Sequence, residues 1–360
     1  MKIIHCSDIH IDSRIDKLPS NKASLRREEV LHSFERMCDF AKQNKVSAVV
    51  ISGDMFDQSK ITKRSLARIM QSILDCNEAI FFYIAGNHDE FVFSDLSIEL
   101  PSNFKIFTKG FSSFRMGNVV IGGFCFDREI SNSFYDNIIF DSADFNILSM
   151  HGQIAEYKSK DQNSLISLPM LKEKNIDYLA LGHYHAYQSG KLDNRGIYAY
   201  SGCLDGRGFD ELEQKGFILI DTEKENKYSF IPFSSRVYHV YEHKLSNGKN
   251  WIDERREIIS YLDQNYSSND LIKVIVKDEI STDYFIDKEE LTVKLNDLFF
   301  FVEIEDKTTL KITAEDYLAD KTVKGEFLKL VWESNLTDEQ KKSVISCGLN
   351  ALKGEDLLWN

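Results

Sequence analysis

Short apolar runs alternate with amphipathic stretches through the first 220 residues of the chain. Apolar residues recur every three or four positions from Val30 to Ala41, and a similar stripe covers residues 66–74, which indicates two helices. Strand-like runs flank these helices and continue beyond them, at residues 3–4, 48–51, 80–84, 119–121, 145–148, 178–181 and 217–220. Alternating strands and helices predict an α/β sheet, and the few helices across residues 105–150 predict a mixed or second sheet there.

The pattern changes near residue 232, where a short connection is expected at residues 232–235. Beyond it, the periodicity predicts helices at residues 252–262 and 288–295 and strands at residues 271–276 and 299–304, and from about residue 322 it is helical. We therefore expect three parts: an α/β domain of residues 1–235, a small α+β domain of residues 236–320 and a helical segment of residues 321–360.

The composition is that of a globular protein with two or three domains, since the chain has 360 residues of which 42% are hydrophobic. Its apolar runs are far shorter than the roughly 20 residues of a membrane-spanning helix, and we expect neither a membrane segment nor a secretion leader. Six scattered cysteines with no C-x-x-C pair argue against a zinc ribbon or a disulfide framework. A reducing cytoplasm fits this cysteine pattern best.

The net charge of −13 weighs against extensive contact with phosphate backbones, which requires a positive surface. The basic group Lys60, Lys63, Arg64 and Arg68 could follow a DNA backbone, but the solvated face of a helix is the slightly favoured interpretation. Bound divalent cations would offset part of the negative charge locally, and a residue count does not include them.

Polar residues of the metal-binding types follow five of the predicted strands. They are Asp8 and His10, then Asp54 and Asp57, then Asn87, His88 and Asp89, then His151, and finally His183 and His185. In a largely parallel sheet these strand ends lie along one edge, where α/β proteins place their sites. We therefore expect these residues to be neighbours in space.

The donor atoms in this set are carboxylate and amide oxygens and imidazole nitrogens, which suit Mn, Fe, Zn or Mg. The absence of cysteine disfavours a purely structural zinc site. These candidate ligands are too many for one tetrahedral ion, but they suit two ions about 4 Å apart that share a carboxylate. Gly53, Gly86 and Gly182 each precede a ligand directly after a strand, where we expect a sharp turn and a close approach of the backbone to the ions.

Taken together and in this order, the motifs resemble those of the calcineurin-like metallophosphoesterases. The stretches "HCSDIHIDS" (residues 5–13), "GDMFDQ" (53–58) and "YSGCLDGRGFDELEQKGFILID" (200–221) are similar to the SbcD-type DNA repair exonucleases, especially the YhaO-like branch. The resemblance implies a four-layer α/β/β/α sandwich with a small capping domain. It also implies a C-terminal segment that engages an SMC-like coiled-coil ATPase.

Carried over by motif position, the resemblance implies that Asp8, His10 and His185 bind one ion and that Asn87, His151 and His183 bind the other, with Asp54 bridging the two. His88 would face the scissile phosphate, and Asp89 would orient its ring. Asp57 would support the site without binding an ion. Arg207, in the glycine-rich stretch, is a possible phosphate contact. His5, His32, His239 and His243 lie outside the motifs and are expected to be ordinary core or surface histidines.

These inferences predict a DNA exonuclease or endonuclease of DNA repair with two divalent ions. Manganese is the expected metal, with Mg, Fe or Zn as alternatives, and the protein is expected to act as a homodimer with the ATPase. A metal-activated hydroxide would attack phosphorus while His88 assists the leaving oxygen. The alternative is a phosphodiesterase or phosphatase that acts on nucleotides or other small phosphate esters. A non-catalytic scaffold is disfavoured because the ligand set is intact.

Overall fold

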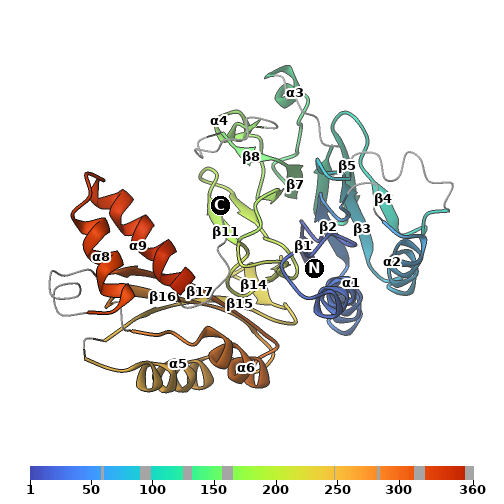
Figure 1. Ribbon diagram of the computed structural model, residues 1–360. Coiled ribbons are helices and arrows are strands. Elements are labelled where there is room, and N and C mark those ends of the chain that lie inside the picture. Colours follow the sequence, from blue (N-terminus) through green and yellow to red (C-terminus); the bar gives the residue numbers. More distant parts are fainter. Residues whose placement is uncertain are drawn as a thin grey trace. The chain divides into compact units, whose positions relative to one another are not determined.

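The computed structural model describes residues 1–57, 61–89, 99–124, 132–155, 165–246, 248–281, 284–311 and 321–352 (Figure 1). Contacts between residues group the chain into two compact units, Met1–Tyr238 and His239–Asn360. The finer division into three domains, with boundaries at residues 235 and 320, stays a prediction.

The first unit contains a six-stranded sheet in the order β14-β13-β1-β2-β3-β4. Its strands are β1 (Lys2–Cys6), β2 (Ala48–Ser52), β3 (Ile80–Ile84), β4 (Phe104–Ile106), β13 (Gly216–Asp221) and β14 (Tyr228–Pro232). Strands β1 to β4 are parallel to one another, whereas β13 and β14 are antiparallel to their neighbours. The carboxyl ends of β1, β2 and β3 therefore lie at one edge.

A second six-stranded sheet follows the order β11-β12-β10-β7-β6-β5. Its strands are β5 (Ser112–Met116), β6 (Val119–Gly123), β7 (Phe145–His151), β10 (Tyr178–Gly182), β11 (Gln188–Lys191) and β12 (Ile197–Tyr200). The four central strands are parallel, and the edge strands β5 and β11 are antiparallel to their neighbours. A separate pair, β8 (Gln153–Ile154) and β9 (Leu165–Ile166), is also parallel. The second sheet predicted from the sequence is thus present.

The apolar runs of the central strands are continuous because both faces of these strands are buried. Along β2, Val49 and Ile51 pack in the cluster that contains the apolar residues of α1 (Ser20–Gln43) and α2 (Lys63–Asp75). The intervening Val50 points the other way, into a cluster shared with Ile147 of the second sheet. The two sheets therefore pack face to face.

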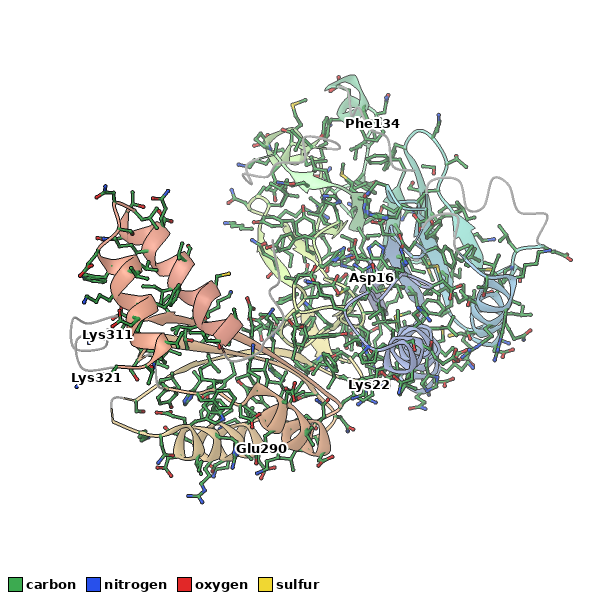
Figure 2. All side chains as sticks on the ribbon, viewed as in Figure 1. Asp16, Lys22, Phe134, Glu290, Lys311 and Lys321 are labelled. Atoms are coloured by element: carbon green, nitrogen blue, oxygen red, sulfur yellow. The ribbon has the colours of Figure 1, made fainter. Side chains whose placement is uncertain are left out.

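Among the described residues, the outer face of the second sheet carries two short helices, α3 (Asn132–Asp136) and α4 (Leu168–Leu171). Phe134 of α3 (Figure 2) packs on this side, with its ring centroid 4.0 Å from that of Phe124. Helices, two sheets and helices form the four layers that the sequence resemblance implies, and this prediction is confirmed.

The second unit is built on the three-stranded sheet β15-β16-β17. Its strands are β15 (Tyr238–Lys244), β16 (Leu271–Ile280) and β17 (Phe301–Leu310), and its helices are α5 (Trp251–Asn265), α6 (Lys288–Leu298), α8 (Val323–Trp332) and α9 (Asp338–Leu352). The apolar faces of α5 and α6 pack on β16 and β17, while α8 and α9 share a small core around Leu328 and Ile345. The strand expected from residue 299 begins two residues later, because Phe299 is the C-cap of α6 and is buried beneath it.

Two features bear on the environment of the protein. Within the described ranges, no helix combines the length and the apolar character needed to cross a bilayer. Five cysteines are free thiols, and the sixth, Cys125, lies outside the described residues.

Candidate metal centre

The predicted ligand residues lie where the carboxyl ends of strands from both sheets meet. Asp8 follows β1 and Asp54 follows β2, and the two loops stay paired because the Asp8 amide donates to the Gly53 carbonyl at 3.1 Å. His151 is the last residue of β7 and His183 follows β10, in the second sheet. The expectation of one sheet edge is therefore corrected: two facing sheets supply the residues.

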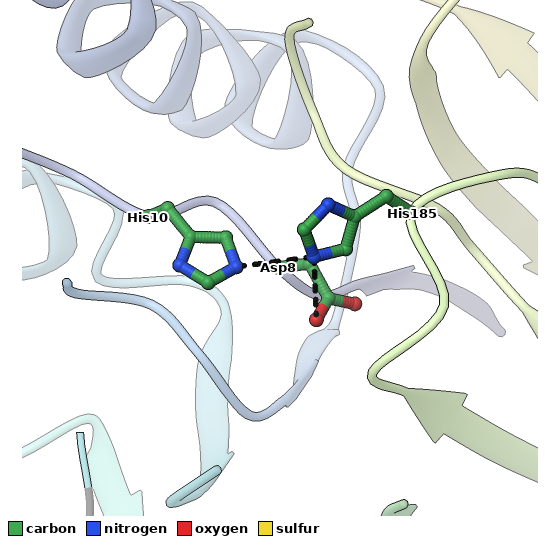
Figure 3. A group of neighbouring side chains, drawn as sticks. All are labelled: Asp8, His10 and His185. Carbon is green, nitrogen blue, oxygen red and sulfur yellow. Dashed lines mark hydrogen bonds and ion pairs between the residues drawn. The ribbon is translucent and has the colours of Figure 1, made fainter. Parts of the chain in front are cut away.

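One group of side chains consists of Asp8, His10 and His185 (Figure 3). The Nε2 atoms of His10 and His185 are 3.2 Å apart, and His185 Nε2 is 3.7 Å from Asp8 Oδ1. Asp8 and His10 are almost completely buried. Two imidazole nitrogens and a carboxylate oxygen thus converge from segments that are far apart in the sequence.

A second group surrounds the side chain of Asp54. His151 Nε2 lies 3.3 Å from Asp54 Oδ2 and 3.0 Å from Asn87 Oδ1, and His183 Nδ1 lies 3.4 Å from the same Asn87 oxygen. Asp54 Oδ2 is also 3.8 Å from His10 Nε2, which belongs to the first group. The carboxylate of Asp54 therefore lies between the two groups, and the structure brings all seven predicted ligand residues together.

Hydrogen bonds on the outer side of two rings turn their other nitrogen toward the centre. His151 Nδ1 lies 2.8 Å from the Ser52 carbonyl, and His185 Nδ1 lies 2.7 Å from Glu211 Oε1. Because a carbonyl or a carboxylate can only accept, each Nδ1 carries the proton. In the neutral ring, each Nε2 then has the lone pair that a metal ion requires.

The charges of the site suit divalent cations. Asp8 and Asp54 have exposed fractions of 0% and 2%, and burial of two carboxylates is costly unless positive charge lies nearby. Burial, followed by the charge of Arg207, holds the pKa of His10 well below its usual range, so that this ring is neutral. Two carboxylates, one amide oxygen and neutral imidazoles form a donor set that fits Mn, Fe, Zn or Mg.

A proton links His151 and Asp54 when no cation is bound. Burial opposes the charged form of His151, but the carboxylate of Asp54 raises the pKa of His151 to about 9. Despite burial, the same contact lowers the pKa of Asp54. Because metal ligands must lose their protons, cation binding at this pair releases a proton and is favoured at higher pH.

Four residues of the site have a backbone conformation that is rare for side chains other than glycine. The φ angles are 52° at Asp8, 51° at His10, 50° at Asp54 and 103° at His183. Such residues cost on the order of 1–3 kcal/mol each and persist only where the surroundings impose them. The loops after β1, β2 and β10 therefore hold the ligand residues under strain, which no sequence pattern indicated.

Two of the glycines permit a close approach of neighbouring groups. Gly53 has a φ of 89°, and a Cβ there would lie 2.2 Å from His151 Nδ1. A Cβ at Gly182 would lie 1.8 Å from the Ser52 carbonyl oxygen. At both positions the backbone packs directly against His151 or the end of β2, and the expected close approach of the backbone to the ions stays a prediction.

His88 lies beside the first group, with its ring centroid 4.9 Å from that of His10. Its Nδ1 is 3.1 Å from Asp57 Oδ1. Asp89 has another role, because its two carboxylate oxygens accept hydrogen bonds from the Gly86 and Met55 amides, each at 2.7 Å. Asp57, and not Asp89 as expected, is therefore the carboxylate that contacts the His88 ring.

Arg207 lies next to His185, at the rim of the first group. Its guanidinium donates to Glu211 Oε1 at 2.7 Å, and its side chain is 19% exposed. The predicted contact between Arg207 and a phosphate stays a prediction. Glu211 was missed because the stretch "DGRGFDELE" contains four acidic residues, and no spacing distinguishes Glu211 from the other three.

Comparison with known proteins identifies a family and several relatives. Residues 1–187 match the calcineurin-like phosphoesterase family. The uncharacterized metallophosphoesterase YhaO of Bacillus subtilis is 26% identical over 245 residues, which span 64% of this chain and 60% of YhaO. The DNA double-strand break repair protein Mre11 of Sulfolobus acidocaldarius is 25% identical over 378 residues, which span 96% of this chain and 94% of that protein.

The match to a solved structure, a dimetal phosphatase from Danio rerio, covers 61% of this chain and 91% of that chain, with 10% identity and a TM-score of 0.40. The family match covers more than half of the chain and includes all seven predicted ligand residues. This protein belongs to the calcineurin-like phosphoesterase family.

Proposed function

We propose that this protein hydrolyses phosphodiester bonds in DNA at a centre of two divalent cations. The observation that carries the proposal is the convergence of seven ligand-type side chains, with Asp54 between the two groups. Proteins of the calcineurin-like family are phosphoesterases with a dinuclear metal centre, which is the chemistry that this donor set suits.

In this proposal, the two groups of side chains hold one cation each. Asp8, His10 and His185 would hold the first, and the second would be held by the residues around Asn87 Oδ1, namely Asn87, His151 and His183. Asp54, which lies between the two groups, would contribute to both sites. When bound, such ions act as Lewis acids on the phosphate and supply a nucleophile from water at neutral pH.

Two residues beside the cations, Asp57 and His88, act on the leaving group: Asp57 orients the His88 ring, and His88 supplies a proton. The Asp57 carboxylate accepts a hydrogen bond from His88 Nδ1, which fixes the ring and leaves Nε2 for the substrate. The side chain of His88 is 39% exposed, so that a substrate can reach it. In its protonated form, His88 donates a proton from Nε2 to the leaving oxygen.

DNA is the proposed substrate because of the relatives. The name of the Mre11 protein describes it as a DNA double-strand break repair protein, and its similarity extends over nearly the whole of this chain. Similarity to YhaO agrees with the SbcD-type motifs, although the match spans less than two thirds of YhaO. We therefore infer an exonuclease or endonuclease of DNA repair, similar to the YhaO-like branch.

The wider assembly is also proposed from the resemblance. We expect manganese as the preferred ion, a homodimer, and an SMC-like coiled-coil ATPase as partner, all acting in the cytoplasm. The helical hairpin of α8 and α9 is the proposed docking segment, because Val323 and Leu330 expose apolar surface on α8, with exposed fractions of 74% and 69%.

Hydrolysis of small phosphate esters is the alternative, and the charge of the protein favours it. The net charge is −13, and Arg68, in the basic stretch that could follow DNA, forms ion pairs with Glu28 and Glu35. Acidic surface repels a long polyanion more strongly than it repels a single nucleotide.

The test is hydrolysis of linear DNA by the Mn²⁺-loaded protein, compared with a small phosphodiester at equal phosphate concentration. We expect DNA cleavage that is lost in His88→Ala by about 10²-fold or more, while Mn²⁺ binding persists. His32→Ala, which changes an exposed histidine of α1, is the matched control and should cleave like the wild type. Rapid turnover of the small ester by an enzyme that leaves DNA intact would favour the alternative.

A further inference from the structure

Glu211 lies outside the proposed ligand set, yet it contacts one of the ligands. It belongs to the loop between β12 and β13, and its exposed fraction is 6%. Its Oε1 atom is 2.7 Å from His185 Nδ1, on the side of the ring opposite Asp8 and His10. A buried carboxylate therefore contacts the outer nitrogen of a proposed metal ligand.

We propose that Glu211 is a positioning residue for His185, and that the affinity of the first cation depends on it. By accepting the proton of Nδ1, Glu211 fixes the tautomer whose Nε2 lone pair faces Asp8 and His10. Such a carboxylate also makes the imidazole a stronger donor to a metal ion. The inference rests on the proposed function, because it requires that His185 binds a cation.

The contacts of Arg207 show why Glu211, and not Arg207, is the partner of the His185 ring. Arg207 Nη2 lies 3.2 Å from His185 Nδ1, but a guanidinium can only donate, and Nδ1 is already a donor to Glu211. The Arg207 guanidinium instead donates to Glu211 Oε1, and the Arg207 amide donates to Glu211 Oε2 at 2.8 Å. Both oxygens of Glu211 are thus held, which fixes its orientation.

The loop that carries Glu211 is anchored at several points. Arg26 of α1, which is completely buried, donates to Asp205 Oδ1 and to the Gly206 carbonyl, each at 2.7 Å. At the other end of the loop, Lys215 Nζ donates to the His185 carbonyl at 3.1 Å. The backbone and the ring of His185 are therefore held by the same loop.

The two groups of proposed ligands differ in how their histidines are oriented. His151 donates to the backbone carbonyl of Ser52, a contact that no side-chain substitution at Ser52 removes. His185 donates to a side chain, which a substitution can remove. A substitution of Glu211 should therefore lower the affinity for the first cation and leave the affinity for the second unchanged.

The experiment measures Co²⁺ and Mn²⁺ binding to the full chain by titration calorimetry, with the Co²⁺ absorption spectrum as the record of coordination. In Glu211→Ala, we expect one ion to bind about 10–100-fold more weakly and the other to keep its affinity. Glu211→Gln retains an oxygen that accepts the Nδ1 proton, so it should recover part of the affinity. The Co²⁺ spectrum should change in Glu211→Ala and return toward that of the wild type in Glu211→Gln.

Glu254→Gln is the matched control, because Glu254 is a buried carboxylate that contacts His243 Nε2 at 2.6 Å in the second unit. It should leave both affinities unchanged. Two ions bound to Glu211→Ala with wild-type affinities would overturn the inference while leaving the proposed function intact, whereas a wild type that binds no ions would overturn the function itself. If Glu211→Ala does not fold, Glu211→Gln decides: it should bind the first ion more weakly than the wild type, and equal affinity would overturn the inference.

Discussion

At the residue scale, Asp57 is a carboxylate that orients the His88 ring but is not a proposed metal ligand. Asp57 Oδ1 is 3.1 Å from His88 Nδ1, and neither residue belongs to the proposed ligand set. We predict that Asp57→Asn lowers kcat about 10–100-fold, because the substitution removes the charge that fixes the His88 ring. Mn²⁺ affinity should stay as in the wild type. Steady-state kinetics and calorimetry check this, and an unchanged kcat would show that the contact has no part in turnover.

His5 is a buried histidine outside the proposed ligand set, and its protonation tests whether the ring is buried in the neutral state. Its ring is completely buried, with Nδ1 2.8 Å from the Tyr178 hydroxyl, and burial lowers its pKa to about 3. An unfolded histidine has a pKa of about 6.5, so between these values the unfolded chain binds the additional proton. The contribution of the neutral, buried His5 ring to the unfolding free energy is therefore fully present above pH about 6.5 and is lost as the pH falls toward 3.

The corresponding measurement is urea unfolding of the metal-free wild type and of His5→Gln, which cannot titrate. Between pH 7 and pH 5, the wild type should lose about 2 kcal/mol more of its unfolding free energy than the variant does, at about 1.4 kcal/mol per pH unit below 6.5. Parallel pH profiles for the two proteins would contradict the buried, neutral state of His5.

At the scale of elements, α1 is connected to the loop before β13 by one buried ion pair. Arg26 and Asp205 are both completely buried, and the Arg26 guanidinium also donates to Glu29. We predict that Arg26→Met lowers the unfolding free energy by about 3–5 kcal/mol, because Asp205 then remains as a buried unpaired charge. Denaturant titration measures this loss.

The double variant Arg26→Met/Asp205→Leu serves as the control for that loss. Removal of both charges eliminates the unpaired carboxylate, so stability should recover in large part. A double variant as unstable as Arg26→Met would indicate that lost packing, and not the unpaired charge, causes the effect.

The hydrophobic pattern predicted which elements form, whereas the four-layer arrangement of these elements came from the resemblance and not from the pattern. Strands such as β2 and β10 were evident because strands buried on both faces are continuously apolar, and each ligand follows such a run. The pairing of a strand is not encoded within its own residues, so the pattern suggested a second sheet but did not assign His151 and Asp54 to different sheets. Nor did it predict the contact between Glu211 and His185, which are 26 positions apart.

On the scale of the whole molecule, net charge bears on the proposed binding of DNA. With a net charge of −13, we expect few positive contacts to phosphates, and the proposed cations would supply part of the attraction. We predict weak binding of the isolated chain to linear DNA, in the range of about 10⁻⁴–10⁻⁶ M at physiological salt, with affinity that falls as salt rises. Fluorescence anisotropy across a salt series tests this, and tight binding that is insensitive to salt would contradict it.

The central claim is that side chains from five segments hold two cations, and counting the ions tests it most directly. Equilibrium dialysis of the metal-free protein against Mn²⁺, followed by elemental analysis, should give two ions per chain for the wild type. Asp54→Ala should retain fewer than two, because Asp54 Oδ2 lies near His10 in one group and His151 in the other. A wild type that binds fewer than two ions at saturating Mn²⁺, or an Asp54→Ala variant that still binds both, would contradict the account.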